Sequence, residues 1–99
     1  MAKLVRDKIP DRIKNDHCVP ITHIASEEEY WKGLKEKLQE EIKEFCDDES
    51  MEEMSDILEV IYAMCDFKGF DRKDLEELRK KKVQERGAFK KRIILDEIK

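Results

Sequence analysis

The sequence has no long apolar stretch, few aromatic residues and no regular cysteine pattern. Aromatic residues are only 7% of the 99 residues, and no apolar run reaches the roughly 18 residues of a membrane span. The opening MAKLVRDKIP has no signal-peptide core. Three cysteines without a CxxC spacing indicate neither a disulfide framework nor a zinc site. These absences predict reduced thiols, no membrane association and a cytoplasmic location.

Charge, by contrast, is abundant and unevenly placed. Charged residues make up 46% of the chain and its net charge is −4, with acids crowded in 27–56 and bases in 72–92. A net negative chain argues against a polymeric nucleic acid as partner, whereas a small anion held through a metal ion suits both halves. We see no repeat or linker, so residues 1–99 are predicted to form one domain. A chain this short buries little surface alone, which favours a homodimer or a dimer of dimers.

Apolar residues recur at helical spacing, which predicts a mainly α fold built on an antiparallel hairpin. The first long helix is expected to begin after Ser26 and to run to about Cys46, and residues 47–49 read as a turn. The second is expected to begin after Ser50 and to end at Gly69. Each serine is followed three residues later by glutamate, the spacing of a capping box.

Further elements are predicted on both sides of this hairpin. Pro10 is suited to the first turn of a brief helix, and Asp71 can cap a third long helix that Gly87 ends. Residues 19–24 and 93–95 are rich in β-branched residues, so we expect them to pair as a short two-stranded element. A four-helix-bundle-like core would then form on oligomerisation.

Four carboxylates stand out within the acidic region. Glu41 and Glu44 are three residues apart, as are Glu53 and Asp56, so each pair lies on one helix face. At about 100° per residue, Glu41 lies within about 20° of Leu34 and so inside the apolar arc. A turn near residue 48 would place the two pairs opposite one another. Together these positions predict one patch of four acids at the edge of the core.

Such a patch is costly without a counter-ion, because like charges repel and lose hydration there. Oxygen ligands favour Mg²⁺, with Mn²⁺ also possible, and no EF-hand loop is present. Two alternatives stay open. The acids can be a solvated helix surface, or Lys37 and Lys43 can neutralise them without any metal.

The acidic spacing resembles a known signature. EExxE (Glu40, Glu41, Glu44) followed by ExxD (Glu53, Asp56) is similar to the motif of the MazG-like all-α nucleoside triphosphate pyrophosphohydrolases, a superfamily that includes phosphoribosyl-ATP pyrophosphohydrolase. The segments KLVRDKIP, EEMSDILEVIYA and KKKVQERGAF resemble a small single-domain branch of it. The resemblance covers nearly the whole chain.

This resemblance implies Mg²⁺-dependent hydrolysis of a nucleoside triphosphate to the monophosphate and pyrophosphate, as in clearing of the nucleotide pool. The metal and catalytic work would fall on the four acids Glu41, Glu44, Glu53 and Asp56. Anionic phosphates need donors, for which Arg and Lys are suited. Bases late in a helix also complement its dipole without a ligand. The candidates for phosphate binding are Arg6, Lys8, Lys82 and Arg86, with Lys90 as a further one.

Two other functions remain possible from the sequence. One is a phosphoribosyl-ATP pyrophosphohydrolase, which shares the acidic pattern. The other is a non-catalytic helical interaction or regulatory module that binds a cation or a protein. Tyr30 and Trp31 read as core aromatics rather than base-stacking residues. His17 and His23 read as structural or exposed rather than catalytic.

Overall fold

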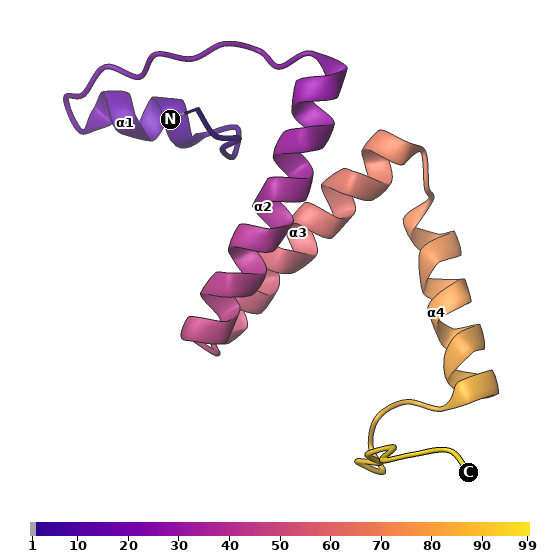
Figure 1. The fold of residues 1–99 in the computed structure, drawn as a ribbon. Coiled ribbons are helices and arrows are strands. Elements are labelled where there is room, and N and C mark those ends of the chain that lie inside the picture. The colour runs from indigo at the N-terminus through magenta and orange to yellow at the C-terminus, as the bar shows by residue number, and fades with distance from the viewer. Residues whose placement is uncertain (1) are drawn as a thin grey trace.

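The computed structural model describes residues 2–99, in which four helices follow one another (Figure 1). They are α1 (Ile9–Asn15), α2 (Glu27–Asp47), α3 (Met51–Lys68) and α4 (Arg72–Arg86). The predicted mainly α fold is therefore confirmed. Over the same described residues, no helix combines the length and the apolar character that crossing a membrane requires.

Both helices of the α2–α3 hairpin begin at the serine that was predicted to cap them. The Ser26 hydroxyl accepts a hydrogen bond from the Glu29 amide at 3.2 Å, and the Ser50 hydroxyl accepts one from the Glu53 amide at 3.3 Å. The Glu29 carboxylate lies 2.9 Å from Nε2 of His23, whereas a capping box would direct it to the amide of Ser26. The hydroxyl half of the motif thus fixes where both helices start.

The α2–α3 contact supplies the core, and this core is small. Leu34, Val60 and Cys65 are the buried apolar residues of the described chain, and Trp31 stacks on Phe67 with ring centroids 5.2 Å apart. The radius of gyration is 18.0 Å, compared with about 13 Å for a compact domain of 100 residues. A single chain therefore leaves much apolar surface exposed. The bundle on oligomerisation stays a prediction.

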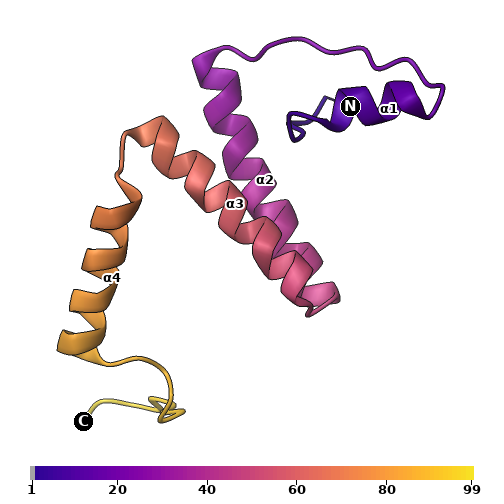
Figure 2. The same cartoon turned by 180° about the vertical axis from the view of Figure 1, so that it is seen from behind.

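Helix α4 leads away from the hairpin in both views (Figures 1 and 2). Asp71 caps it as predicted, and it ends at Gly87, whose φ is 84°. Arg72 ties its first turn to α3 through an ion pair with Asp66 at 3.2 Å and through the ring of Tyr62, 4.2 Å away. No residue of α4 is buried, so local interactions rather than a core hold this helix.

The predicted β pairing is absent from residues 2–99, which contain no strand. Segments 19–24 and 93–95 lie at opposite ends of the molecule (Figure 1). Ile21 is 96% exposed, so the first segment has no surface to pack on. β-branched residues favour strands chiefly where they pack on a half-buried face, and an isolated two-stranded ribbon is marginally stable. Composition alone was therefore a poor guide to these two segments.

Candidate metal centre and adjoining cavity

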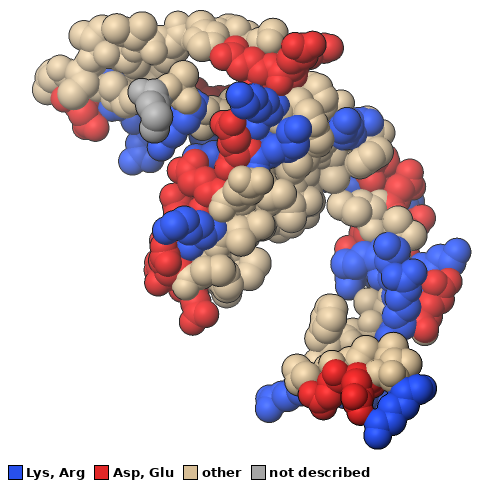
Figure 3. Space-filling view, in the orientation of Figure 1, with Lys and Arg blue, Asp and Glu red and all other residues tan. Residues whose placement is uncertain are grey.

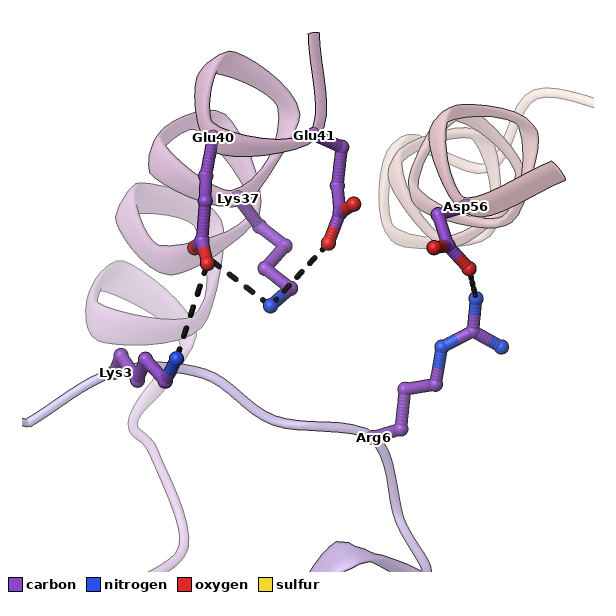
Figure 4. A network of polar contacts seen from close by, with 6 residues as sticks. All are labelled: Lys3, Arg6, Lys37, Glu40, Glu41 and Asp56. Carbon is purple, nitrogen blue, oxygen red and sulfur yellow. Dashed lines mark hydrogen bonds and ion pairs between the residues drawn. The ribbon is translucent and has the colours of Figure 1, made fainter. Parts of the chain in front are cut away.

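Three of the predicted acids meet between the two helices of the hairpin. Glu41 of α2 and Glu53 and Asp56 of α3 each offer a carboxylate oxygen, and these atoms all lie within 4.8 Å of one another. The short turn after α2 brings the end of one helix beside the start of the next, and the three-residue spacing keeps Glu53 and Asp56 on one face. Glu41 and Asp56 point from facing helices into the same space (Figure 4).

Burial separates this cluster from an ordinary acidic surface. Glu41 is only 7% exposed, and its Oε2 is buried without a hydrogen-bond partner, as is Oε2 of Glu53. A buried carboxylate oxygen without a partner is expensive, because it loses hydration and gains nothing in return. Oxygen ligands converging at this spacing suit a hard divalent cation such as Mg²⁺. The residues present therefore fit the metal that the sequence predicts.

The electrostatics of the cluster agree with an excess of negative charge. Burial raises the pKa of Glu41 above its ordinary value, and the charge of Glu44 and a hydrogen bond to it raise it further, while Lys37 lowers it. Burial also raises the pKa of Glu53, and the nearby charges of Asp56 and Glu41 add to the effect. A cation at the cluster would relieve these repulsions.

Glu44 lies at the edge of this cluster rather than inside it. Its side chain is exposed, and its charge raises the pKa of the neighbouring Glu41. The three converging carboxylates do not include it. Of the four predicted acids, three thus converge as possible metal ligands, and the fourth, Glu44, lies beside them.

One of the two lysines weighed as counter-ions contacts the cluster. Lys37 Nζ lies 3.4 Å from Glu41 Oε1 and 3.6 Å from Glu40 Oε2 (Figure 4). Lys43 instead pairs with Asp47 at 3.0 Å, farther along the helix. Lys37 engages Oε1 of Glu41, and the buried Oε2 is left without a partner. One lysine therefore neutralises part of the cluster only.

A cavity of about 520 Å³ opens beside the acids, a size within the range of small-molecule sites. Its wall is charged near the cluster and mostly apolar farther along α2 and α3, where Asp66 is the exception. Arg6 donates to Asp56 across it, with Nη2 2.7 Å from Oδ1. The residues lining its charged part include Arg6, Lys8, Lys37, Glu41, Asp56 and Glu59, and those of the apolar part include Tyr30, Leu34, Val60 and Ala63.

The four predicted phosphate ligands divide into two groups. Arg6 and Lys8 line the cavity, whereas Lys82 and Arg86 lie on α4 and do not. Acidic side chains gather on the hairpin and basic ones on α4 (Figure 3). Because α4 has no buried residue, nothing within one chain folds its basic face back onto the acids. The structure therefore brings only the N-terminal pair to the cluster.

Sequence reasoning missed three contributors to this region. Lys37 was weighed only as a counter-ion, although its spacing of four residues before Glu41 indicates a direct contact. Tyr30 lines the cavity, four residues before the buried Leu34 on the same helix face. Gly33 contacts the N-terminal segment. No sequence pattern pointed to that contact, because it joins residues far apart in the chain.

Comparisons with known proteins add little to this geometry. No family model matches the chain, and no solved structure matches it. An uncharacterized protein of Mycolicibacterium smegmatis is 46% identical over 44 residues, which make up 44% of this chain. The match covers 45% of that protein, so the chain spans less than half the length of this curated relative. The MazG-like resemblance therefore stays a prediction from motifs.

Proposed function

We propose that the chain is a Mg²⁺-dependent nucleoside triphosphate pyrophosphohydrolase that releases a nucleoside monophosphate and pyrophosphate. The observation that carries the proposal is the buried, unpartnered Oε2 of Glu41, which converges with carboxylates of Glu53 and Asp56. A cavity with basic residues adjoins these acids directly. The spaced EExxE and ExxD motifs support the same chemistry.

In this proposal the acids and bases have separate tasks. Glu41, Glu53 and Asp56 hold Mg²⁺, with Glu44 at the edge of the site; Mn²⁺ is a possible substitute. The ion supplies charge neutralisation of the triphosphate and activation of the attacking water. Arg6 and Lys8 then bind phosphate oxygens, Arg6 through its planar fork and Lys8 as a point charge.

The apolar part of the cavity suits the remainder of the nucleotide. Tyr30, Leu34 and Val60 line this part, and Asp66 lies at the same end of the cavity as Tyr30. Tyr30 precedes Glu41 by 11 residues (41 − 30), which corresponds to a rise of about 16 Å along α2. This length favours an extended ligand with a charged end and an apolar end, as a nucleotide is.

We further propose that two copies pair, as a homodimer or within a dimer of dimers. Leu58 and Leu75 expose apolar surface around a groove of about 510 Å³ between α3 and α4. Two hairpins packed together would give a four-helix bundle with metal ligands in its interior. Lys82 and Arg86, remote from the acids of their own chain, could then serve those of the partner. A monomer by light scattering that retains full activity would refute this pairing.

The central test is hydrolysis of a nucleotide panel with Mg²⁺, including phosphoribosyl-ATP. Pyrophosphate is the expected product. Release of orthophosphate alone contradicts the proposal, as does full activity of Glu41→Ala or Asp56→Ala. Preferential hydrolysis of phosphoribosyl-ATP would instead support the histidine-synthesis activity that the motifs also fit.

A second candidate is a non-catalytic interaction module, which the apolar groove beside α4 favours. Leu58, Ile61, Tyr62 and Leu75 line this groove together with Arg72, Glu76 and Arg79 of α4, and the middle of the hairpin is largely uncharged on the face seen in Figure 3. This candidate predicts no turnover of any nucleotide. It also predicts that Mg²⁺ raises the melting temperature, because the acidic cluster still binds a cation.

A further inference from the structure

The N-terminal arm, residues 2–8, lies across the hairpin beside the acidic cluster. Leu4 packs against Gly33 in the interior of α2, and a Cβ added to Gly33 would lie 3.3 Å from Cβ of Leu4. That spacing is tighter than ordinary packing allows, so a larger residue at position 33 would push the arm outward. The absence of a side chain at Gly33 thus lets the arm approach the helix closely.

Gly33 differs from the other two glycines of the chain. Gly69 and Gly87 adopt positive φ values of 72° and 84°, which favour glycine for backbone reasons. Gly33 lies within a regular helix, where glycine is less favourable than alanine. Its backbone therefore gives no reason for glycine, and the close approach of Leu4 does.

The arm makes two polar contacts with the hairpin, one on either side of Leu4. Lys3 Nζ lies 3.8 Å from Glu40, and Arg6 Nη2 lies 2.7 Å from Asp56, a carboxylate of the cluster (Figure 4). The Arg6 side chain is 56% exposed, so burial does not hold its guanidinium in place. Leu4, two residues earlier, is half-buried and packs on α2 at Gly33, and the half-buried Val5 lies between it and Arg6.

We propose that the contact of Leu4 with Gly33 is a positioning contact that holds Arg6 over the metal centre, as part of a triphosphate site. This inference rests on the proposed function. Leu4 and Gly33 act through Arg6 and do not touch the ligand. If a divalent cation engaged the carboxylate of Asp56, Arg6 would be able to donate to a phosphate oxygen instead. The anchored arm keeps the guanidinium within reach throughout this exchange.

The test is titration calorimetry with inorganic tripolyphosphate and Mg²⁺, which requires no hydrolysis. Gly33→Gln keeps a good helix former but displaces Leu4, and Leu4→Ser removes the anchor without adding bulk to α2. Each should weaken tripolyphosphate binding about ten-fold, and Arg6→Ala should do the same. This is the effect expected from the loss of one hydrogen bond to a charged group. Lys32→Gln is the matched control, because it adds the same side chain at a neighbouring exposed position and should bind within about two-fold of the wild type.

Double variants separate positioning from a general structural role. Because Gly33 acts through Arg6, Gly33→Gln combined with Arg6→Ala should bind no more weakly than Arg6→Ala alone. Losses that multiply in the double variant would overturn the inference. So would wild-type affinity in both Gly33→Gln and Leu4→Ser.

A ligand-free measurement keeps this inference distinct from the proposed function. In nuclear Overhauser spectra of the wild type, the Leu4 methyls should show a cross-peak to the Gly33 α-protons, and its absence would overturn the positioning contact. A wild type that binds no tripolyphosphate with Mg²⁺ would overturn both this inference and the proposed function. Wild-type binding that the variants leave intact would overturn this inference alone.

Discussion

The α2–α3 hairpin and the α4 region illustrate two ways in which this sequence uses charge. In the hairpin, Glu41 is almost fully buried beside other acids, and an oxygen of its carboxylate has no partner. On α4 the charged residues are exposed, and Glu76 and Arg79 pair with each other at 2.6 Å. The first arrangement costs stability that a bound cation would restore, whereas the second carries little cost.

The two regions also differ in what holds them together. The hairpin has a core around Leu34 and a stacked pair, Trp31 and Phe67. Helix α4 has a cap, local ion pairs and contacts through Arg72, but no buried residue. Function and stability should therefore respond to changes in the hairpin much more than to equivalent changes in α4.

The largest expected effect is on activity. Glu41→Gln and Asp56→Asn should each lower the rate of pyrophosphate release with Mg²⁺ by at least about 100-fold. Loss of a residue that only hydrogen-bonds a metal ligand costs up to about 100-fold, and loss of the ligand itself should cost at least as much. Glu36→Gln, an exposed substitution on the same helix, is the control and should retain activity. Equal rates in all three variants would remove the distinction between buried and solvated acids.

The next effect concerns stability. Leu34→Ala should lower the free energy of unfolding by about 2–5 kcal/mol, because Leu34 is 2% exposed at the centre of the hairpin. Leu78→Ala on α4 should change it by about 0.5 kcal/mol or less in a monomer, since Leu78 is 51% exposed. Urea denaturation monitored by circular dichroism measures both.

The same pair of variants also tests for pairing of chains. If α4 lies in an interface between copies, Leu78→Ala should weaken the assembly. The melting temperature would then depend on protein concentration, and more so in the variant than in the wild type. A comparable loss in both variants at every concentration would mean that α4 belongs to the core of one chain.

A smaller effect should appear in the pH dependence of stability. The pKa values of Glu41 and Glu53 are raised above 4.5 in the folded state, so folding favours their protonated forms. Their contribution to stability is fully present below about pH 4.5 and is lost as the pH rises through the raised values. Without metal, the wild type should therefore lose stability relative to Glu41→Gln between pH 4.5 and 7.

Mg²⁺ should reverse this difference at pH 7. The cation binds the ionised carboxylates, so it should raise the melting temperature of the wild type more than that of Glu41→Gln. Protonation competes with the cation, so this stabilisation should shrink as the pH falls. Thermal scans from pH 4.5 to 7, with and without Mg²⁺, measure it. Identical pH profiles for wild type and variant would contradict the raised pKa of Glu41.

The sequence predicted correctly those features that depend on contacts between residues close together in the chain. It did not predict those that depend on contacts between distant residues. Ser26, Ser50 and Asp71 marked helix starts correctly because capping is a local interaction. The facing of Glu41 and Asp56 followed from helical period and a short turn. The arm contact at Gly33 depends on tertiary packing that no local pattern encodes.

The failed strand prediction has the same cause. Residues 19–24 have the composition of a strand, but strand formation needs a partner and a surface, and neither is near them. Likewise, the placement of Lys82 and Arg86 depended on where α4 goes. The sequence around these two residues predicted a basic helix, but it did not indicate what that helix packs against.

The smallest expected effect is confined to α4. Asp71→Ala removes an acceptor that the amides of Lys73 and Asp74 share, at 2.7 and 3.3 Å, and should cost about 1 kcal/mol of local helix stability. Because α4 has no buried residue, its amides should exchange hydrogen faster while those of α2 and α3 stay protected. Ser50→Ala, the matched cap removal in the hairpin, should instead accelerate exchange across both helices of the core. If Asp71→Ala also exposed the hairpin amides, α4 would have to stabilise the hairpin, and the two regions would form one cooperative unit.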